Sequence, residues 1–355
     1  MELGRRSVEA VDVIADPPAS PPTPQSVLVT GAHGVLGAWL TAALLDGGHR
    51  VVAIRRDEPA ASALELLGRA GQVDTVHGDI CEEGLVARAL SEYEVSSVFH
   101  LAAQTLVGTA NHAPRSTFET NIRGTWMLLE ACRAHGTRSV VVASSDKAYG
   151  RQAELPYRET QPLAPTFPYD VSKAAADLIA RSYWHTFGLP VAVTRFANLD
   201  GGGDTNHSRL VPEAVGAALA GRAPVIRSDG SPERDFLYVE DAVAAYLAIW
   251  RALLTGRGGG EAFNAGGGRP HRVADVVDLI CRLAGGVDGV GGPLVPEIRG
   301  VGTPHGEIDR QWVDATKLRE LTGWAPEVDL EEGLRRTIAW YREHPRALSP
   351  LRQTV

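Results

Sequence analysis

Three glycines with the spacing GxxGxxG stand between a short apolar run and a helix-like stretch near the start of the chain. The run 26–30 (SVLVT) is rich in β-branched residues and predicts a buried strand, whereas 38–48 predicts a helix closed by two glycines. Such glycines let a strand turn tightly into a helix whose free N–H groups can bind a pyrophosphate. A plain βα turn is the alternative. The spacing favours a dinucleotide site that includes Gly31, His33, Gly34, Val35, Leu36 and Gly37.

The rest of the first two hundred residues alternates between strand and helix patterns. Further strands are expected at 50–54, 73–80, 95–103, 138–145 and 189–196, with helices between them, notably 116–136 and 169–188. This alternation predicts an α/β fold, a doubly wound parallel sheet of the Rossmann type. We expect a disordered, proline-rich tail over 1–25, the Rossmann domain over 26–195, and a smaller C-terminal α/β substrate lobe over 196–345. Within that lobe, 260–286 is expected to return to the sheet.

Composition and charge exclude several classes of function. With 35 basic and 43 acidic residues the formal net charge is −8, which disfavours nucleic-acid binding. We also expect no membrane contact, because no apolar run reaches about 18 residues. Cys81, Cys132 and Cys281 lie far apart, so we expect no metal site. The absence of a signal-peptide pattern at the N-terminus and the scattered cysteines together predict a cytoplasmic protein.

The residues after the second predicted strand bear on the cofactor. An acidic residue at this place binds the ribose hydroxyls of NAD. Here Arg55 and Arg56 stand there, and arginine favours the 2′-phosphate of NADP. Two solvated surface arginines are the alternative, and Asp57 could still reach a ribose. We therefore expect NADP as the cofactor, with NAD possible.

Tyr169 and Lys173 lie four residues apart on a predicted helix and share one face. A cation beside a phenol lowers the pKa of the phenol from its ordinary value near ~10, so Tyr169 could act as a general base. A solvated surface pair would be the usual interpretation of this spacing alone. The glycine loop upstream makes the catalytic interpretation the stronger one.

Taken together, these motifs resemble the extended short-chain dehydrogenases/reductases of the NAD(P)-dependent epimerase/dehydratase type. The resemblance runs in order over residues 26–342. It implies cofactor contacts from the glycine loop, Tyr169 and Lys173, and also from Asp79, Ile80, Leu101, Ala102 and Ala103. The motifs that carry it are TGAHGVLG (30–37), Gly78-Asp79-Ile80, His100-Leu101-Ala102-Ala103-Gln104, Asn121, SSDKAYG (144–150), YDVSK (169–173), Arg195-Phe196-Ala197-Asn198 and RDFLYVEDAV (234–243).

Within this family the sequence is most similar to the CDP-glucose 4,6-dehydratase branch, with GDP-mannose 4,6-dehydratase a close cousin. The stretches that carry the similarity are GAHGVLGAWL (31–40), HLAAQTLV (100–107), SSDKAY (144–149) and GGGD with SRLVPEAV (201–204 and 208–215). Dehydratases place a hydroxyl, an aspartate and a third catalytic residue where this chain has Ser145-Asp146-Lys147. The resemblance implies that Tyr169 takes the C4 hydroxyl proton during C4 oxidation. Asp146 would then act as the acid at C6 and Lys147 as the base at C5, and the reverse assignment stays open. A loop salt bridge is the structural alternative for this pair.

The substrate implied is a nucleotide-diphosphate sugar, which becomes a 4-keto-6-deoxy sugar. Arg209 and Arg234 are candidates for the diphosphate, because a guanidinium can hold phosphate oxygens with two donors, although each could be a structural ion pair. Asn198 and Gln104 are further substrate candidates, and Asp200 departs from the aromatic residue of many relatives. A nucleotide-sugar C4-epimerase or decarboxylase is the main alternative function, and a non-catalytic dinucleotide-binding regulator a remote one.

Two predicted helices, 112–134 and 169–187, carry apolar faces. In the extended family the matching helices build a homodimer, so the resemblance implies one here. Burial of both faces within a single chain is the alternative.

Overall fold

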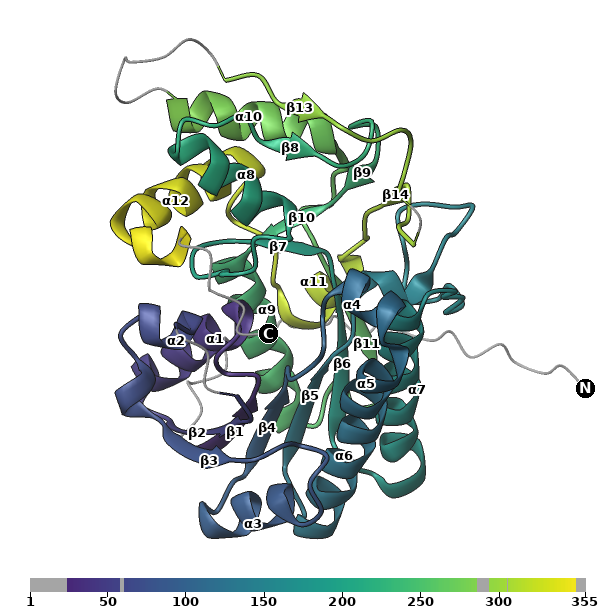
Figure 1. The fold of residues 1–355 in the computed structure, drawn as a ribbon. Coiled ribbons are helices and arrows are strands. Elements are labelled where there is room, and N and C mark those ends of the chain that lie inside the picture. Colours follow the sequence, from purple (N-terminus) through teal and green to yellow (C-terminus); the bar gives the residue numbers. More distant parts are fainter. Residues whose placement is uncertain (1–23, 58–60, 286–293, 305, 349–355) are drawn as a thin grey trace, which may run out of the picture.

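A seven-stranded parallel sheet with the strand order β11-β6-β5-β4-β1-β2-β3 forms the centre of the molecule (Figure 1). The computed structural model describes residues 24–57, 61–285, 294–304 and 306–348. The predicted tail therefore lies outside the described residues except for residues 24 and 25. The strands are β1 (Ser26–Thr30), β2 (Arg50–Arg55), β3 (Asp74–His77), β4 (Ser97–His100), β5 (Ser139–Ala143), β6 (Val191–Phe196) and β11 (Ala262–Ala265).

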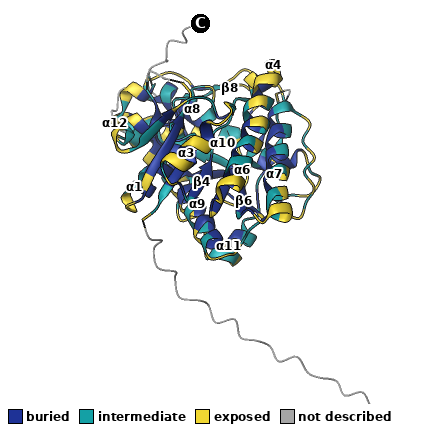
Figure 2. Ribbon diagram, turned by 90° about the horizontal axis from the view of Figure 1, so that it is seen from below, coloured by how far each residue is buried: buried dark blue, intermediate teal, exposed yellow. Residues whose placement is uncertain are grey.

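The central strands form here because their sequences are apolar on both sides. β5 reads SVVVA and β6 reads VAVTRF, and every residue of β6 is buried. Such near-continuous apolar runs are typical of parallel strands covered on two faces. One face packs on α1 (Val35–Asp46), α2 (Ala63–Leu66), α9 (Val239–Leu254) and α11 (Thr316–Thr322), and the other on α3 (Leu85–Glu92), α6 (Gly124–His135) and α7 (Pro168–Phe187). Figure 2 shows the strands as the buried layer between these helices. The predicted doubly wound Rossmann sheet is confirmed.

A smaller group of elements lies beyond the carboxyl ends of the strands (Figure 1). In it, β7 (Asn198–Asp200) pairs in parallel with β10 (Phe236–Tyr238). A separate apolar cluster joins its helices α8 (Leu210–Leu219), α10 (Val273–Gly285) and α12 (Leu330–Glu343). Five short strands complete it in two small sheets. In one, β8 (Val225–Ile226) pairs with β13 (Glu297–Ile298). In the other, β9 (Glu233–Arg234) lies between β12 (His271–Arg272) and β14 (Arg310–Gln311).

The chain passes between the two groups more than once. β11 pairs with β6 in the central sheet, within the segment 260–286 that the sequence assigns to the sheet. In contrast, α10 from the same segment packs on α8 and α12, because Val276, Val277 and Ile280 face that cluster. α9 and α11 also lie against the central sheet. The small lobe is thus assembled from separate stretches of 196–345.

Candidate active site

In the glycine turn after β1, neighbouring backbone segments lie too close together to leave room for side chains. Gly31 has φ +77°, and a Cβ there would lie 2.8 Å from the backbone N of Ala102 and the carbonyl carbon of Leu101. A Cβ on Gly37 would collide with the carbonyl oxygen of Gly31. Gly34 precedes α1 as its N-cap residue and Val35 and Leu36 open the helix, so the unpaired N–H groups of the first turn lie beside this cradle. The cradle fits a pyrophosphate group.

His33 fastens this turn to the helix that follows β2. Its Nδ1 lies 3.1 Å from Ser62 Oγ, and its carbonyl accepts the Ala63 N–H at 3.2 Å. Ser62 also caps α2 through Glu65. These contacts give His33 a structural role, because they hold the glycine turn against the start of α2.

The ends of β3 and β4 supply the other residues predicted to contact the cofactor. Asp79 Oδ1 accepts the Cys81 N–H at 2.8 Å, and Ile80 is buried against the start of α6. Leu101, Ala102 and Ala103 follow β4 directly. The Ala102 N–H donates to Thr30 Oγ1 at 3.2 Å, which ties this segment to the end of β1.

Both arginines expected to meet a 2′-phosphate are already matched by carboxylates. Arg55 Nη2 lies 3.1 Å from Glu65 Oε1, and its Nε donates to the Asp57 carbonyl at 3.1 Å. Arg56 Nη2 lies 2.7 Å from Asp57 Oδ2, and Arg56 Nη1 lies 3.7 Å from Asp79 Oδ2. The Arg55 side chain is only 13% exposed. The partner Glu65 comes from α2, ten residues downstream.

Ser145, Asp146 and Lys147 follow β5 and begin the 3₁₀ turn Asp146–Tyr149. Ser145 Oγ caps the turn by accepting the Lys147 N–H at 3.2 Å, and it donates to Asp146 Oδ1 at 3.1 Å. Asp146 is buried, and its Oδ2 accepts Gln311 Nε2 at 2.6 Å. Burial raises the pKa of Asp146, while the hydrogen bond from Gln311 opposes this rise.

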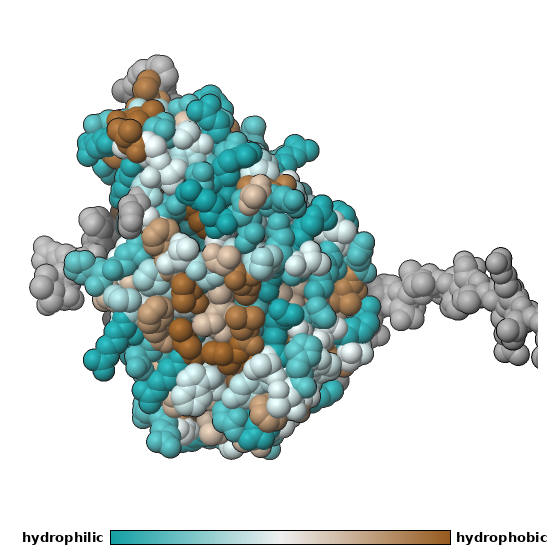
Figure 3. Space-filling model, turned by 90° about the vertical axis from the view of Figure 1, so that its right-hand side faces the viewer, coloured by the Kyte–Doolittle hydropathy of each residue, from teal (hydrophilic) through white to brown (hydrophobic). Residues whose placement is uncertain are grey.

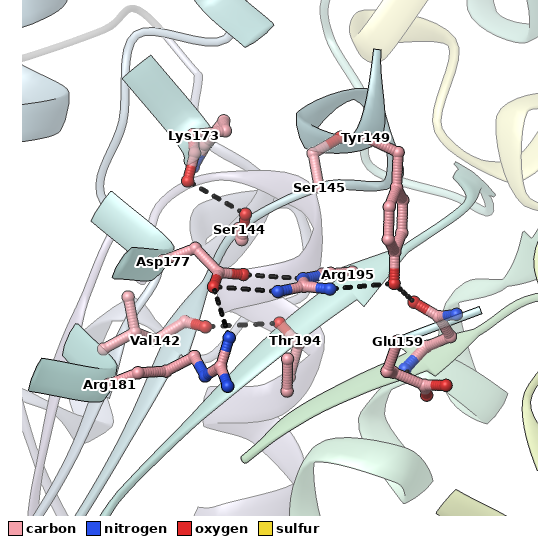
Figure 4. Close-up of polar contacts among 12 residues, drawn as sticks. Val142, Ser144, Ser145, Tyr149, Glu159, Lys173, Asp177, Arg181, Thr194 and Arg195 are labelled. Carbon is pink, nitrogen blue, oxygen red and sulfur yellow. Dashed lines mark hydrogen bonds and ion pairs between the residues drawn. The ribbon is translucent and has the colours of Figure 1, made fainter. Parts of the chain in front are cut away.

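Tyr169 and Lys173 lie in the first turns of α7, next to that segment, and both are buried. Lys173 Nζ donates to the carbonyl of Ala143 at 2.9 Å. The Lys173 carbonyl accepts Ser144 Oγ at 3.0 Å (Figure 4). Burial lowers the pKa of Lys173 to about 8. The structure therefore places the five predicted catalytic residues in one region at the carboxyl ends of β5 and β6.

The predicted lowering of the Tyr169 pKa is wrong for this structure. Burial raises the pKa of Tyr169 to about 12. The cation that opposes this rise most is Arg209, with a smaller lowering from a hydrogen bond with Ser145. Spacing on a helix places the phenol and the amine on one face, but desolvation of the phenol outweighs the lowering of its pKa by Arg209 and Ser145.

A buried ion pair fixes β6 to α7 below this region. Arg195 Nε and Nη2 lie 2.7 and 3.0 Å from the two carboxylate oxygens of Asp177, and Nη1 donates to Tyr149 Oη at 3.0 Å (Figure 4). Tyr149 Oη in turn donates to Asn264 Oδ1 on β11 at 2.8 Å. A bidentate pair of this kind holds two elements in a fixed orientation. It sets the position of the helix that carries Tyr169.

The four predicted substrate residues divide into two kinds. Gln104 and Asn198 use their amides within the protein: Gln104 Nε2 donates to Thr117 Oγ1 at 3.0 Å, and Asn198 Nδ2 donates to the Asp235 carbonyl at 3.2 Å. Arg209, like Arg234, forms an ion pair: its Nη1 lies 2.8 Å from Asp204 Oδ2, and its Nη2 donates to Thr105 Oγ1 at 2.8 Å in the loop after β4.

Arg234 lies beside the predicted catalytic segment. Its Nη2 is 3.4 Å from Glu307 Oε2, and the same oxygen lies 3.0 Å from Lys147 Nζ. The structure therefore brings Arg234 to the lysine of the Ser145-Asp146-Lys147 segment through a shared carboxylate.

Three residues of this region were not found from the sequence. Glu307 comes from the stretch that leads into β14 and Gln311 from β14 itself, both far from the motifs, and no local pattern marks them. Asp170 could have been noticed, because it stands inside YDVSK. It is buried, and burial raises the pKa of Asp170 to about 7, with the Lys147 charge opposing this.

Two further properties of the described residues bear on the predicted partners. In the part of the chain that the structure describes, no group of three or more His, Cys, Asp or Glu side chains is arranged to hold a metal ion. Among the described helices, none combines the length and the apolar character needed to cross a membrane.

The fold and site together define an extended short-chain dehydrogenase/reductase. The family model for GDP-mannose 4,6 dehydratase matches residues 28–337. The dTDP-glucose 4,6-dehydratase of Xanthomonas campestris pv. campestris is 34% identical over 332 residues, covering 88% of this chain and 92% of the relative. The UDP-glucose 4-epimerase of Mycolicibacterium smegmatis is also 34% identical, covering 89% and 98%.

A solved structure gives the same result. DesIV, the dTDP-glucose 4,6-dehydratase of Streptomyces venezuelae solved with NAD bound, superposes with a TM-score of 0.81 at 30% identity, covering 92% of this chain and 100% of that one. The chain belongs to the GDP-mannose 4,6-dehydratase family. The predicted superfamily is thereby confirmed, whereas the nearness to the CDP-glucose branch stays a prediction.

Proposed function

We propose that the protein is a nucleotide-sugar 4,6-dehydratase, a lyase that forms an NDP-4-keto-6-deoxy sugar. The observation that carries this proposal is the pair Asp146 and Lys147, next to Tyr169 and Lys173 at the carboxyl end of the sheet. C4 oxidation alone needs one base and a hydride acceptor, whereas loss of water needs a further acid and base. The dTDP-glucose 4,6-dehydratases similar to this chain support the same reaction class.

Each residue has a defined task in this proposal. Tyr169 takes the proton of the C4 hydroxyl as a phenolate, the form that the charge of Arg209 and the hydrogen bond with Ser145 favour against burial. Lys173 holds the last residue of β5 through the Ala143 carbonyl. The 4-ketone acidifies the C5 proton, and Asp146 and Lys147 act as the acid–base pair for loss of water across C5 and C6. A cofactor held at the glycine turn after β1 would supply the hydride acceptor for C4 and the hydride donor for C6. Arg234 and Arg209 are proposed to hold the diphosphate.

The experiment is incubation of the purified protein with CDP-, GDP-, UDP- and dTDP-hexoses, followed by mass spectrometry. We expect one nucleotide sugar to lose the mass of one water without consumption of external reductant. The UDP-glucose 4-epimerase relative makes epimerisation the competing function. A product of unchanged mass with inverted C4 would establish that function instead.

For the cofactor we propose a nicotinamide dinucleotide and, within that class, NAD. The NADP preference expected from the sequence gains no support, because Arg55 and Arg56 are both engaged by carboxylates. Similar solved structures carry NAD. We expect the wild-type protein to bind NAD more tightly than NADP in fluorescence titrations.

The variant Glu65→Gln tests the reason for this preference. Glutamine can still accept the Ser62 N–H that Glu65 accepts at 2.8 Å, but it no longer neutralises Arg55. We expect NADP to bind on the order of tenfold more tightly to this variant, with NAD little changed. Tighter binding of NADP by the wild-type protein would contradict this cofactor proposal.

We also propose a homodimer formed through α6 and α7. Figure 3 shows apolar side chains gathered on the face that carries these helices, where Trp126, Leu178 and Phe187 are 43%, 57% and 56% exposed. We expect sedimentation velocity to give a dimer, and Leu178→Glu to weaken association on the order of tenfold or more. The control is Val301→Glu, at an exposed position of the other lobe. A monomeric wild-type protein would rule this interface out.

A further inference from the structure

The acid of the proposed elimination site receives a hydrogen bond from the C-terminal lobe. Gln311 Nε2 donates to Asp146 Oδ2 at 2.6 Å, although the two residues are 165 positions apart in the sequence. Both residues are buried, since Gln311 is 0% exposed and Asp146 2%. A hydrogen bond at this depth is electrostatically stronger than one in water, because the local dielectric is low. The contact therefore bears directly on the chemistry of Asp146.

The backbone around Gln311 is fixed to both lobes. In the small lobe, β14 pairs in parallel with β9, and the Gln311 carbonyl accepts the Asp235 N–H at 3.1 Å. The carbonyl of the next residue, Trp312, accepts the Tyr157 N–H at 2.8 Å. Tyr157 in turn stacks on Tyr149 of the 3₁₀ turn, with the ring centroids 4.8 Å apart. These contacts hold the Gln311 amide against the turn that carries Asp146.

The other atom of the same amide is left unpaired. Gln311 Oε1 is buried, and within the described ranges of the chain no donor forms a hydrogen bond to it. An unpaired buried acceptor is unfavourable, and an apolar side chain at a purely structural position would avoid it. Among the described residues, Asp146 is the one partner of the Gln311 side chain. This singles out the contact with Asp146 as the reason for a glutamine here.

The two carboxyl oxygens of Asp146 face different groups. Oδ2 faces the Gln311 amide, whereas Oδ1 accepts Ser145 Oγ at 3.1 Å. Ser145 also shares a hydrogen bond with Tyr169, so Oδ1 is the oxygen on the side of the proposed base for the C4 hydroxyl. An oxygen that accepts an N–H is disfavoured as the one that carries the acid proton. The Gln311 N–H therefore leaves that proton to Oδ1.

Resting on the proposed dehydratase function, with Asp146 as the acid, we infer that Gln311 is a positioning residue that acts through Asp146. Its N–H keeps the acid proton on Oδ1, and it stabilises the negative charge that develops on the carboxylate as this proton passes to the departing C6 oxygen. A hydrogen bond to a charged acceptor is stronger than one to a neutral acceptor. The bond thus strengthens as the reaction proceeds, and a preorganised interaction of this kind lowers the barrier.

Two opposing effects on Asp146 agree with this role. Burial raises the pKa of Asp146 and so favours the protonated form that a proton donor needs. The hydrogen bond from Gln311 lowers the pKa again, as do the charges of Lys147 and Arg234, and so assists release of the proton.

The proton and electron balance of the elimination closes. Lys147 takes the proton from C5, and the electron pair of that C–H bond forms the C5–C6 double bond. The C6–O bond breaks with its electron pair on oxygen, and the proton from Asp146 completes a water molecule. Asp146 remains as the carboxylate, and Lys147 returns its proton to C5 when hydride reaches C6. Tyr169 takes one proton from the C4 hydroxyl and Asp146 gives one, so the whole reaction neither gains nor loses a proton.

The test measures the two steps separately in Gln311→Met, which keeps the length of the side chain but removes its N–H. We expect kcat for dehydration to fall about tenfold with KM near the wild-type value, because the lost bond acts on the acid. C4 oxidation, followed as reduced cofactor in a single turnover, should stay near the wild-type rate. The matched control is Gln72→Met, at an exposed position where the amide oxygen accepts Arg69 Nη1 at 3.1 Å.

A double variant shows whether the effect passes through Asp146. Asp146→Asn lacks the proton donor, so adding Gln311→Met to it should cause no further loss of dehydration. A further tenfold loss in the double variant, or an equal loss of C4 oxidation in Gln311→Met, would make Gln311 structural and overturn the inference. An unchanged dehydration rate in Gln311→Met would overturn it as well. Failure of the wild-type protein to dehydrate any sugar nucleotide would instead reject the proposed function on which the inference rests.

Discussion

Replacement of Tyr169 by phenylalanine is expected to slow C4 oxidation by about 100-fold or more, because the variant removes the group proposed to take the hydroxyl proton. The phenol is buried at the start of α7. Stopped-flow detection of reduced cofactor in a single turnover measures this step directly. Binding of the oxidised cofactor should change little, since the ring stays in place.

The same helix offers a matched control. Tyr183 lies near the other end of α7, where its hydroxyl donates to Glu130 at 3.3 Å. Tyr183→Phe should oxidise substrate at the wild-type rate. Near-normal oxidation by Tyr169→Phe would exclude Tyr169 as the base.

Replacement of Asp146 by asparagine or of Lys147 by methionine is expected to separate oxidation from dehydration. Either change removes one partner of the acid–base pair, so dehydration should fall about 100-fold or more while C4 oxidation persists. Reduced cofactor should then accumulate, because the acceptor at C6 is never formed. Absorbance of the reduced nicotinamide measures C4 oxidation, and mass spectrometry of the sugar measures dehydration.

Lys317→Met is the control for the lysine change. Lys317 pairs with Glu261 at 2.6 Å on α11, in a different part of the molecule from the proposed site, and should not affect either step. Dehydration at the wild-type rate by both Asp146→Asn and Lys147→Met would make the pair structural and remove the basis for the dehydratase proposal.

The fold was predictable because its signals are local. The glycine turn, the apolar strands and the Tyr169–Lys173 spacing are each patterns within a few residues. The structure puts the glycine turn and Tyr169–Lys173 at the carboxyl end of the sheet that the apolar strands form. The path of 260–286 was less predictable, because β11 and α10 carry similar apolar content but pack in different lobes.

The charges of the site were not predictable in the same way. The partner of Arg55 lies ten residues away on α2, and the partner of Lys147 lies 160 residues away, so neither pairing leaves a pattern in the sequence. The predicted direction of the Tyr169 pKa shift is wrong for a related reason. Helical spacing gives the distance to a cation but not the depth of burial, and burial decides the direction of the shift.

The central claim is that hydride leaves C4 and returns to C6 of the same sugar after water is lost. The most direct test uses the accepted nucleotide hexose with deuterium at C4, and locates the label in the product by NMR and mass spectrometry. The dehydratase account predicts a 4-keto sugar lighter by one water, with the deuterium in the C6 methyl group. A product that keeps its C6 hydroxyl and carries the deuterium at an inverted C4 would contradict it.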